Sequence, residues 1–154
     1  MKKSVLQYLE RTCAKFPNKI AFADNKRKVT YTEFLENSKR IGSYLSVLEK
    51  MNIAILTDLK NKEKAKTMTE ENKVLCYNEL IKKDVDDIYL KNVREKMIDT
   101  DPMYILFTSG STGIPKGTVI CHKSVIAYTN WVKDTFEINE QTTFGSQTPF
   151  YFSM

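Results

Sequence analysis

The sequence predicts an α/β protein with a mixed β-sheet and helices packed on it. Two observations predict this class. Short apolar, β-branched runs such as residues 53–57 and 103–107 have the length and composition of buried strands. Longer stretches such as residues 6–16 and 34–45 carry apolar side chains at helical spacing. Segments of both kinds occur along the whole chain, as in a sheet covered by helices.

Composition limits the protein to one domain of a soluble, globular type. The chain has 154 residues, of which 42% are hydrophobic and 28% are charged, which is an ordinary balance for such proteins. No apolar run approaches the roughly 18 residues that a membrane span requires. The N-terminal segment lacks the long apolar stretch of a signal peptide. We therefore expect a cytoplasmic protein without a membrane span.

The number and spacing of the cysteine and histidine residues, and the distribution of charge, exclude several classes of function. Three widely spaced cysteines and a single histidine, His122, predict reduced thiols and no zinc site. Cys121 and His122 are adjacent, and adjacent residues rarely chelate one metal ion. The net charge of +5 comes mainly from scattered lysines, not from a basic stripe, so no nucleic-acid partner is expected. This charge is compatible with a polyphosphate substrate.

The N-terminal third predicts a helix, a hairpin and a second helix. Ser4 can cap the first helix, which Pro17 ends. Residues 20–23 and 28–30 predict the two strands of a hairpin around a turn. The sequence from Thr30 to Glu33 is a capping-box pattern that opens the second helix. That helix is expected to bury a stripe formed by Phe34, Leu35, Ser38, Ile41 and Leu45.

The middle of the chain is rich in lysine and less informative. Residues 53–57 predict a buried strand, and residues 58–68 predict a helix with a charged outer face. Residues 74–77 predict another short strand. We interpret residues 84–99 as a weakly defined connection, because their apolar side chains are dispersed among many charges.

The last third has the clearest pattern. Residues 103–107 predict an apolar strand, and residues 119–121 predict a second one after a loop rich in Gly, Ser and Thr. Residues 123–136 carry apolar side chains at helical spacing. Residues 142–147 predict a return to strand, and residues 149–152 form an aromatic segment.

The loop from residue 108 to residue 117 has the chemistry of a phosphate-binding site. Its glycines permit positive φ and remove Cβ atoms, so backbone N–H groups can converge on an anion. Its hydroxyls can donate to phosphate oxygens or help hold Mg²⁺, and its lysine adds a mobile positive charge. The candidate phosphate-binding residues are Thr108, Ser109, Gly110, Ser111, Thr112, Gly113, Lys116 and Gly117.

This loop is not a Walker A motif, because Lys116 follows Pro115 and precedes Gly117. It also connects two strands, so no helix N-terminus follows it directly. The simpler alternative is a flexible turn. A loop that follows an apolar strand and ends in Pro-Lys-Gly is a more specific pattern than a flexible turn, and it favours the phosphate-binding interpretation.

With these residues the chain resembles the AMP-forming synthetase superfamily. Residues 106–117 are similar to the signature of that superfamily, and residues 30–35 are similar to its N-terminal Thr-Tyr-x-Glu-Leu start. Residues 144–152 are similar to the segment that follows the phosphate loop in amino-acid-activating members. Within these members the resemblance is greatest to D-alanine–carrier-protein ligases, which have a Gln-x-Pro-Phe-x-Phe run.

The resemblance implies a reaction and its participants. Such enzymes use ATP, with Mg²⁺, to convert a carboxylate into an acyl-adenylate, and then transfer the acyl group to a thiol, here that of an acyl carrier protein. Residues 108–117 would hold the β- and γ-phosphates. Phe150 and Phe152 would line the acyl pocket, although an aromatic core strand is an equal alternative. Ser153 stands where amino-acid-activating relatives usually place an Asp for the substrate ammonium.

The chain also departs from the length of this superfamily. The passage from residue 48 to residue 53 is several dozen residues shorter than in relatives, and no counterpart of the adenine-binding or C-terminal segments follows residue 153. Residues 1–154 are therefore expected to form a truncated, incomplete N-terminal AMP-binding domain. We expect no turnover from it alone and assign no catalytic or metal-ligating residue. The alternative is an inactive remnant or a nucleotide-binding module that keeps only the phosphate loop.

Overall fold

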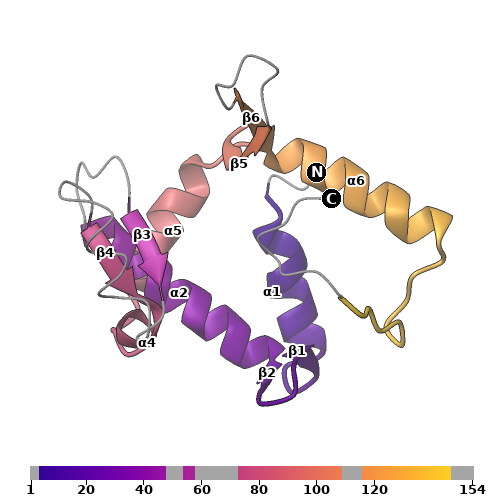
Figure 1. Cartoon of the computed structure of the whole chain (residues 1–154), viewed down its shortest axis with the longest axis horizontal. Helices are drawn as coiled ribbons and strands as arrows, with labels where there is room; N and C mark the ends of the chain where they lie inside the picture. The colour runs from indigo at the N-terminus through magenta and orange to yellow at the C-terminus, as the bar shows by residue number, and fades with distance from the viewer. Residues whose placement is uncertain (1–3, 48–53, 58–72, 109–115, 147–154) are drawn as a thin grey trace. The chain divides into compact units, whose positions relative to one another are not determined.

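The structure is a computed structural model that describes residues 4–47, 54–57, 73–108 and 116–146 (Figure 1). Its contacts divide the chain into two compact units, residues 8–96 and residues 1–7 with 97–154, and each unit is described by itself. The α/β class is confirmed. Both antiparallel and parallel strand pairs occur, and the described strands form three separate two-stranded sheets.

The first helix and hairpin follow the sequence prediction. Helix α1 spans Leu6–Lys15, and the hydroxyl of Ser4 accepts the N–H of Leu6 at 3.2 Å. Strands β1 (Ile20–Ala23) and β2 (Lys28–Thr30) pair antiparallel. The turn between them depends on Asp24, whose carboxylate accepts two backbone N–H groups at 2.7 Å each. These hydrogen bonds lower the pKa of Asp24 from its ordinary value.

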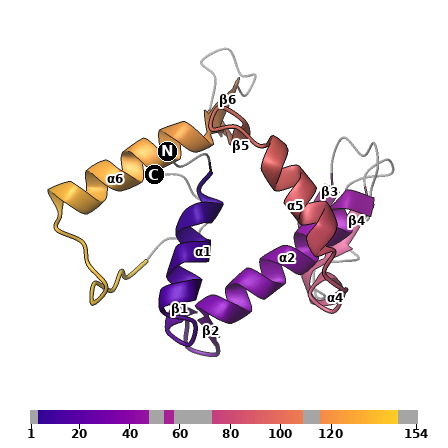
Figure 2. The same ribbon diagram turned by 180° about the vertical axis from the view of Figure 1, so that it is seen from behind.

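Helix α2 spans Tyr31–Val47 and begins as the capping pattern predicts. The hydroxyl of Thr30 accepts the N–H of Glu33 at 3.2 Å, and the carboxylate of Glu33 pairs with Arg27 of the hairpin. The rings of Phe22 and Phe34 meet edge to face with centroids 5.0 Å apart. In both views the β1–β2 hairpin lies at the start of α2 (Figures 1 and 2).

The buried stripe expected on α2 is wrong in part. Leu45 is 45% exposed, whereas Ser43 is only 4% exposed. The reason is that α2 packs on another helix through small residues: a Cβ added at Gly42 would lie 3.2 Å from Leu90. The hydroxyl of Ser43 accepts the N–H of Asp86 at 2.9 Å. Close approach of the two helices therefore depends on small side chains, which apolar periodicity does not reveal.

The connection expected at residues 84–99 is also wrong, because helix α5 spans Asp87–Lys96 there. The carboxylate of Asp86 caps this helix by accepting the N–H of Tyr89 at 2.8 Å. Arg94 pairs with Glu10 at 2.8 Å and tethers the helix to α1. An acidic cap before apolar residues spaced three and four apart was the missed signal.

Strands β3 (Ala54–Thr57) and β4 (Lys73–Cys76) pair in parallel, close to the predicted positions. The short helix α4 (Tyr77–Leu80) follows β4 directly. The most buried apolar side chains of the described residues lie here: Leu75, Cys76 and Leu80 are at most 4% exposed. The helix expected at residues 58–68 lies outside the described residues.

The second unit contains a hairpin followed by a helix. Strands β5 (Pro102–Thr108) and β6 (Lys116–Cys121) pair antiparallel, and α6 spans His122–Thr135, so these three predictions are confirmed. The strand expected at residues 142–147 is wrong for residues 142–146, which have no regular structure. A strand needs a hydrogen-bonded partner, and none of the described strands pairs with this segment.

The aromatic segment at residues 149–152 lies outside the described residues. No helix in the described part of the chain combines the length and the apolar character that crossing a membrane demands.

Replacing Ser43 tests the packing of α2. Ser43→Ala should lower the free energy of unfolding by about 1–2 kcal/mol, because Ser43 is buried and its hydroxyl is the acceptor for the N–H of Asp86. Urea unfolding followed by far-UV circular dichroism measures this change. Ser38→Ala is the matched control, since its hydroxyl bonds to Phe34 within the same helix, and should stay within about 0.5 kcal/mol. Equal effects of the two substitutions would contradict this account.

Candidate nucleotide-phosphate site

The β5–β6 hairpin brings the two ends of the predicted phosphate loop together. Thr108 lies opposite Lys116, and Phe107 lies opposite Gly117, in an antiparallel register. Directly opposed residues in such a pair have Cα atoms about 4.5–5.5 Å apart. The structure thus places the first residue of the loop beside its lysine, although the two are separated along the chain.

The centre of the loop lies outside the described residues. Ser109, Gly110, Ser111, Thr112 and Gly113 are therefore not placed, and their phosphate contacts stay a prediction. Lys116, the first residue of β6, is exposed. Of the predicted site residues, the structure brings together the two that frame the loop, and Gly117 beside them.

Gly117 is needed for close packing of side chains. A Cβ atom at this position would lie 3.0 Å from Cγ2 of Ile105 and 3.3 Å from Cε1 of Phe107. Both neighbours lie on β5, across the pair from Gly117. Its backbone is not in the left-handed region, so the glycine is not explained by a positive φ. It is explained by the space that the side chains of Ile105 and Phe107 occupy.

The open end of the hairpin, opposite the loop, is anchored by backbone hydrogen bonds. The carbonyl of Asp101 accepts the N–H of His122 at 3.3 Å, and the carbonyl of Asp99 accepts that of Lys123 at 2.7 Å. The carboxylate of Asp101 accepts the N–H of Ile98 at 2.9 Å. These bonds join the segment before β5 to the start of α6 and hold both strands in place.

His122 is buried at the start of α6. It is only 7% exposed, and its Nδ1 accepts the N–H of Val5 at 3.5 Å. Ser4, next to Val5, is 1% exposed. The described residues contain no cluster of three His, Cys, Asp or Glu side chains that could hold a metal ion. The contact between the N-terminal segment and α6 was not predicted, because no local pattern links residues so distant in sequence.

Cys121 occupies the junction between β6 and α6. Its Sγ lies 3.3 Å from the hydroxyl of Ser124. This hydrogen bond, aided by the backbone N–H of Ser124, lowers the pKa of the thiol from its ordinary value of 9.0, since both stabilise the thiolate. The reactivity of the Cys121 thiol therefore reports on the local structure at the end of β6.

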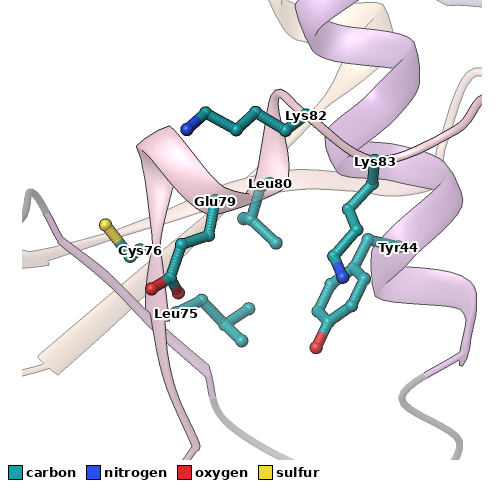
Figure 3. Close-up of a pocket in the computed structure, with 7 residues that line it drawn as sticks. All are labelled: Tyr44, Leu75, Cys76, Glu79, Leu80, Lys82 and Lys83. Atoms are coloured by element: carbon teal, nitrogen blue, oxygen red, sulfur yellow. The ribbon is translucent and has the colours of Figure 1, made fainter.

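The predicted acyl-pocket residues Phe150, Phe152 and Ser153 lie outside the described residues. A hollow of about 420 Å³ does exist in the other unit, beside β4 and α4 (Figure 3). None of the predicted site residues in the described part of the chain lines it. Its floor is apolar and its rim carries charged side chains, and its lining comprises Tyr44, Leu75, Cys76, Glu79, Leu80, Lys82 and Lys83.

The Cys121 thiol gives a test of this local geometry. Ser124→Ala should raise the pKa of Cys121 toward its ordinary value, because the largest stabilising hydrogen bond is removed. The pH dependence of iodoacetamide alkylation, followed by mass spectrometry of the Cys121 peptide, reports this shift. Thr129→Ala on the same helix should leave the alkylation profile unchanged. An unchanged profile in Ser124→Ala would show that the hydroxyl does not support the thiolate.

Comparison with known proteins identifies the family. Residues 47–154 match the AMP-binding enzymes. Over 65 residues the chain is 35% identical to a D-alanine–D-alanyl carrier protein ligase of Lacticaseibacillus casei (strain BL23), a stretch that covers 42% of this chain and 13% of that protein. The chain thus spans only a small part of the length of this relative.

Solved structures show the same fold. The chain is similar to McyG A-PCP complexed with phenylalanyl-adenylate, with a TM-score of 0.69 and 17% identity, over 90% of this chain and 31% of that one. It is also similar to the N-terminal subdomain of Klebsiella oxytoca NpsA, with a TM-score of 0.54 and 18% identity, over 80% and 44% of the two chains. Because the family match covers more than half of its residues, this chain belongs to the AMP-binding enzymes, the superfamily of AMP-forming adenylating enzymes.

Proposed function

We propose that this chain supplies the ATP-phosphate-binding segment of a ligase that adenylates a small amino acid, with D-alanine as the first candidate. The observation that carries the proposal is the hairpin register, which sets Lys116 opposite Thr108 at the ends of a loop rich in Gly, Ser and Thr. Family membership supports the same reaction class. On this view residues 1–154 act as part of an N-terminal AMP-binding domain.

The chemistry requires positive charge and hydrogen-bond donors near the leaving pyrophosphate. Negative charge develops on that group when the substrate carboxylate attacks the α-phosphorus, and preorganised donors lower the barrier. Lys116 and the hydroxyls of Thr108, Ser109, Ser111 and Thr112 are the donors we assign to this role. Mg²⁺ would be bound to the phosphate oxygens of ATP, and the loop hydroxyls would complete its oxygen ligands.

D-Alanine is proposed because the aligned relatives are named as D-alanine–D-alanyl carrier protein ligases. An acyl carrier protein is the corresponding acceptor. Phe150 and Phe152 would border the acyl pocket. Ser153 offers a hydroxyl to the substrate ammonium, which provides less charge compensation than a carboxylate.

A nucleotide-binding module without catalysis is the second candidate. It is favoured by the small share of the McyG A-PCP chain that superposes on this chain, which is only 31%. Under this alternative the loop would still hold ATP, while no acyl-adenylate would form. The two candidates are separated by measuring binding and turnover independently.

Binding of ATP·Mg²⁺ should depend on Lys116. Lys116→Ala should raise the dissociation constant for ATP·Mg²⁺ about 10- to 100-fold, because a charge-assisted hydrogen bond to phosphate is worth about 1.5–3 kcal/mol. Isothermal titration calorimetry measures this effect. Lys123→Ala is the matched control. Lys123 lies just beyond the other end of β6, so this substitution should not change the affinity for ATP·Mg²⁺. Unaltered affinity in Lys116→Ala would remove the phosphate role.

Turnover should be absent from this chain by itself. We expect no detectable ATP–pyrophosphate exchange with D-alanine or other small amino acids, because most of the fold of longer adenylating proteins has no counterpart in the chain. The radiolabelled exchange assay, with a full-length D-alanine–D-alanyl carrier protein ligase as positive control, checks this. Robust exchange would contradict this expectation and establish the chain as a complete catalyst.

A further inference from the structure

The two ends of the β5–β6 hairpin have different registers. At the open end Pro102 lies opposite Cys121, whereas at the loop end Thr108 lies opposite Lys116. The register shifts by one residue directly after Pro102, because Met103 is one residue more on β5 than β6 matches. Such an extra residue is a β-bulge, and bulges beside functional sites often redirect a side chain. The place of Lys116 in the hairpin therefore depends on where the extra residue lies.

The same two strands have an alternative register. If the pairing at the open end continued without the shift, each later residue of β5 would lie opposite the residue one position earlier on β6. Phe107 would then lie opposite Lys116, and Leu106 would lie opposite Gly117. This register keeps the pairing at the open end and only moves the bulge toward the loop. A feature between the bulge and the loop must therefore select the observed register.

The missing side chain of Gly117 is such a feature. Gly117 lies opposite Phe107, and Ile105, two positions earlier on β5, shares the same face of the pair. A Cβ at Gly117 would lie 3.0 Å from Cγ2 of Ile105 and 3.3 Å from Cε1 of Phe107. Both distances are shorter than an ordinary van der Waals contact. The two side chains therefore occupy space that only a glycine leaves open.

The alternative register would fill this space. Lys116 would then lie opposite Phe107, and its Cβ would take the place that Gly117 holds in the observed register. Ile105 and Phe107 would have to move, because extra atoms forced into a packed position destabilise it. The packing over Gly117 thus favours the register in which Lys116 lies opposite Thr108.

We propose that Ile105 and Phe107 are positioning residues for Lys116. By packing over Gly117 they select the register that sets this lysine opposite Thr108. They need no contact with a nucleotide, because they act through the strand pairing. A slip of one residue would displace Lys116 by about 3.4 Å along β5 and exchange the faces of the strand. This inference rests on the phosphate role proposed for Lys116, whereas the register can be measured without ATP.

Cross-linking measures the register directly. Leu106 and Thr118 are opposed, so their Cα atoms are about 4.5–5.5 Å apart, which is within the range of a disulfide. Leu106→Cys with Thr118→Cys should therefore form a disulfide under mild oxidation, identified by mass spectrometry of the linked peptides. In this background Gly117→Ala should lower the disulfide yield about tenfold, because the added Cβ disfavours the observed register.

A second substitution tests whether the effect is steric. Ile105→Ala added to Gly117→Ala should restore the disulfide yield, because it removes the atom nearest to the new Cβ. Val119→Ala added to Gly117→Ala is the matched control. Val119 lies opposite Ile105 but is not among the nearest neighbours of that Cβ, so this substitution should not restore the yield.

Binding of ATP·Mg²⁺ should follow the register in the same variants without the added cysteines. We expect Gly117→Ala to raise the dissociation constant about tenfold in isothermal titration calorimetry, although Lys116 is unchanged. The added Ile105→Ala should return the dissociation constant to within about threefold of its original value. If Gly117→Ala does not fold by circular dichroism, Ile105→Ala with Phe107→Ala replaces it and should lower both the disulfide yield and the affinity.

The other outcomes have distinct meanings. Weaker ATP binding in Gly117→Ala with an unchanged disulfide yield would show that the glycine acts at the nucleotide, and would overturn the proposal. Failure of Ile105→Ala to restore the yield, or an unchanged yield in Ile105→Ala with Phe107→Ala, would also overturn it. Unaltered affinity in Lys116→Ala, with the expected changes in disulfide yield, would contradict the phosphate role of Lys116 and confirm that Ile105 and Phe107 select the register.

Discussion

Antiparallel pairing of β5 with β6 is the constraint on which the proposed phosphate site of this protein depends. The register sets Thr108 opposite Lys116 and Phe107 opposite Gly117. A slip by one residue would transfer every side chain to the other face of the strand. Lys116 would then no longer lie opposite Thr108. One set of backbone hydrogen bonds thus determines where charge and where apolar surface are presented.

This pairing needs support from outside the hairpin, because an isolated two-stranded hairpin is only marginally stable in water. The support comes from the segment around Asp101, which bonds to the start of α6, and from Val5, which donates to His122. Of these partners, only Val5 lies far from the loop in sequence. A nucleotide that binds only the folded hairpin would stabilise it further by mass action. Nucleotide binding would therefore favour this folded arrangement.

Small residues decide the packing in both units. Gly42 and Ser43 allow α2 to approach α5, and Gly117 makes room for side chains of β5. In each case the contact exists because a side chain is small or absent. An interpretation based on apolar periodicity finds the large residues of a core and overlooks such positions. This is the reason that the buried stripe of α2 was assigned in part to Leu45, which is exposed, and not to Ser43.

The sequence by itself determined the α/β class, the positions of most helices and strands, and the superfamily. These features are local: capping by Ser4 and Thr30, and an apolar strand before a loop rich in Gly and Ser, are read within a few residues. Only the tertiary structure decided the Thr108–Lys116 register, the burial of Ser43 and the anchoring of His122. Those features depend on contacts between distant segments, whose geometry is set by the packing of the whole unit and not by any local pattern.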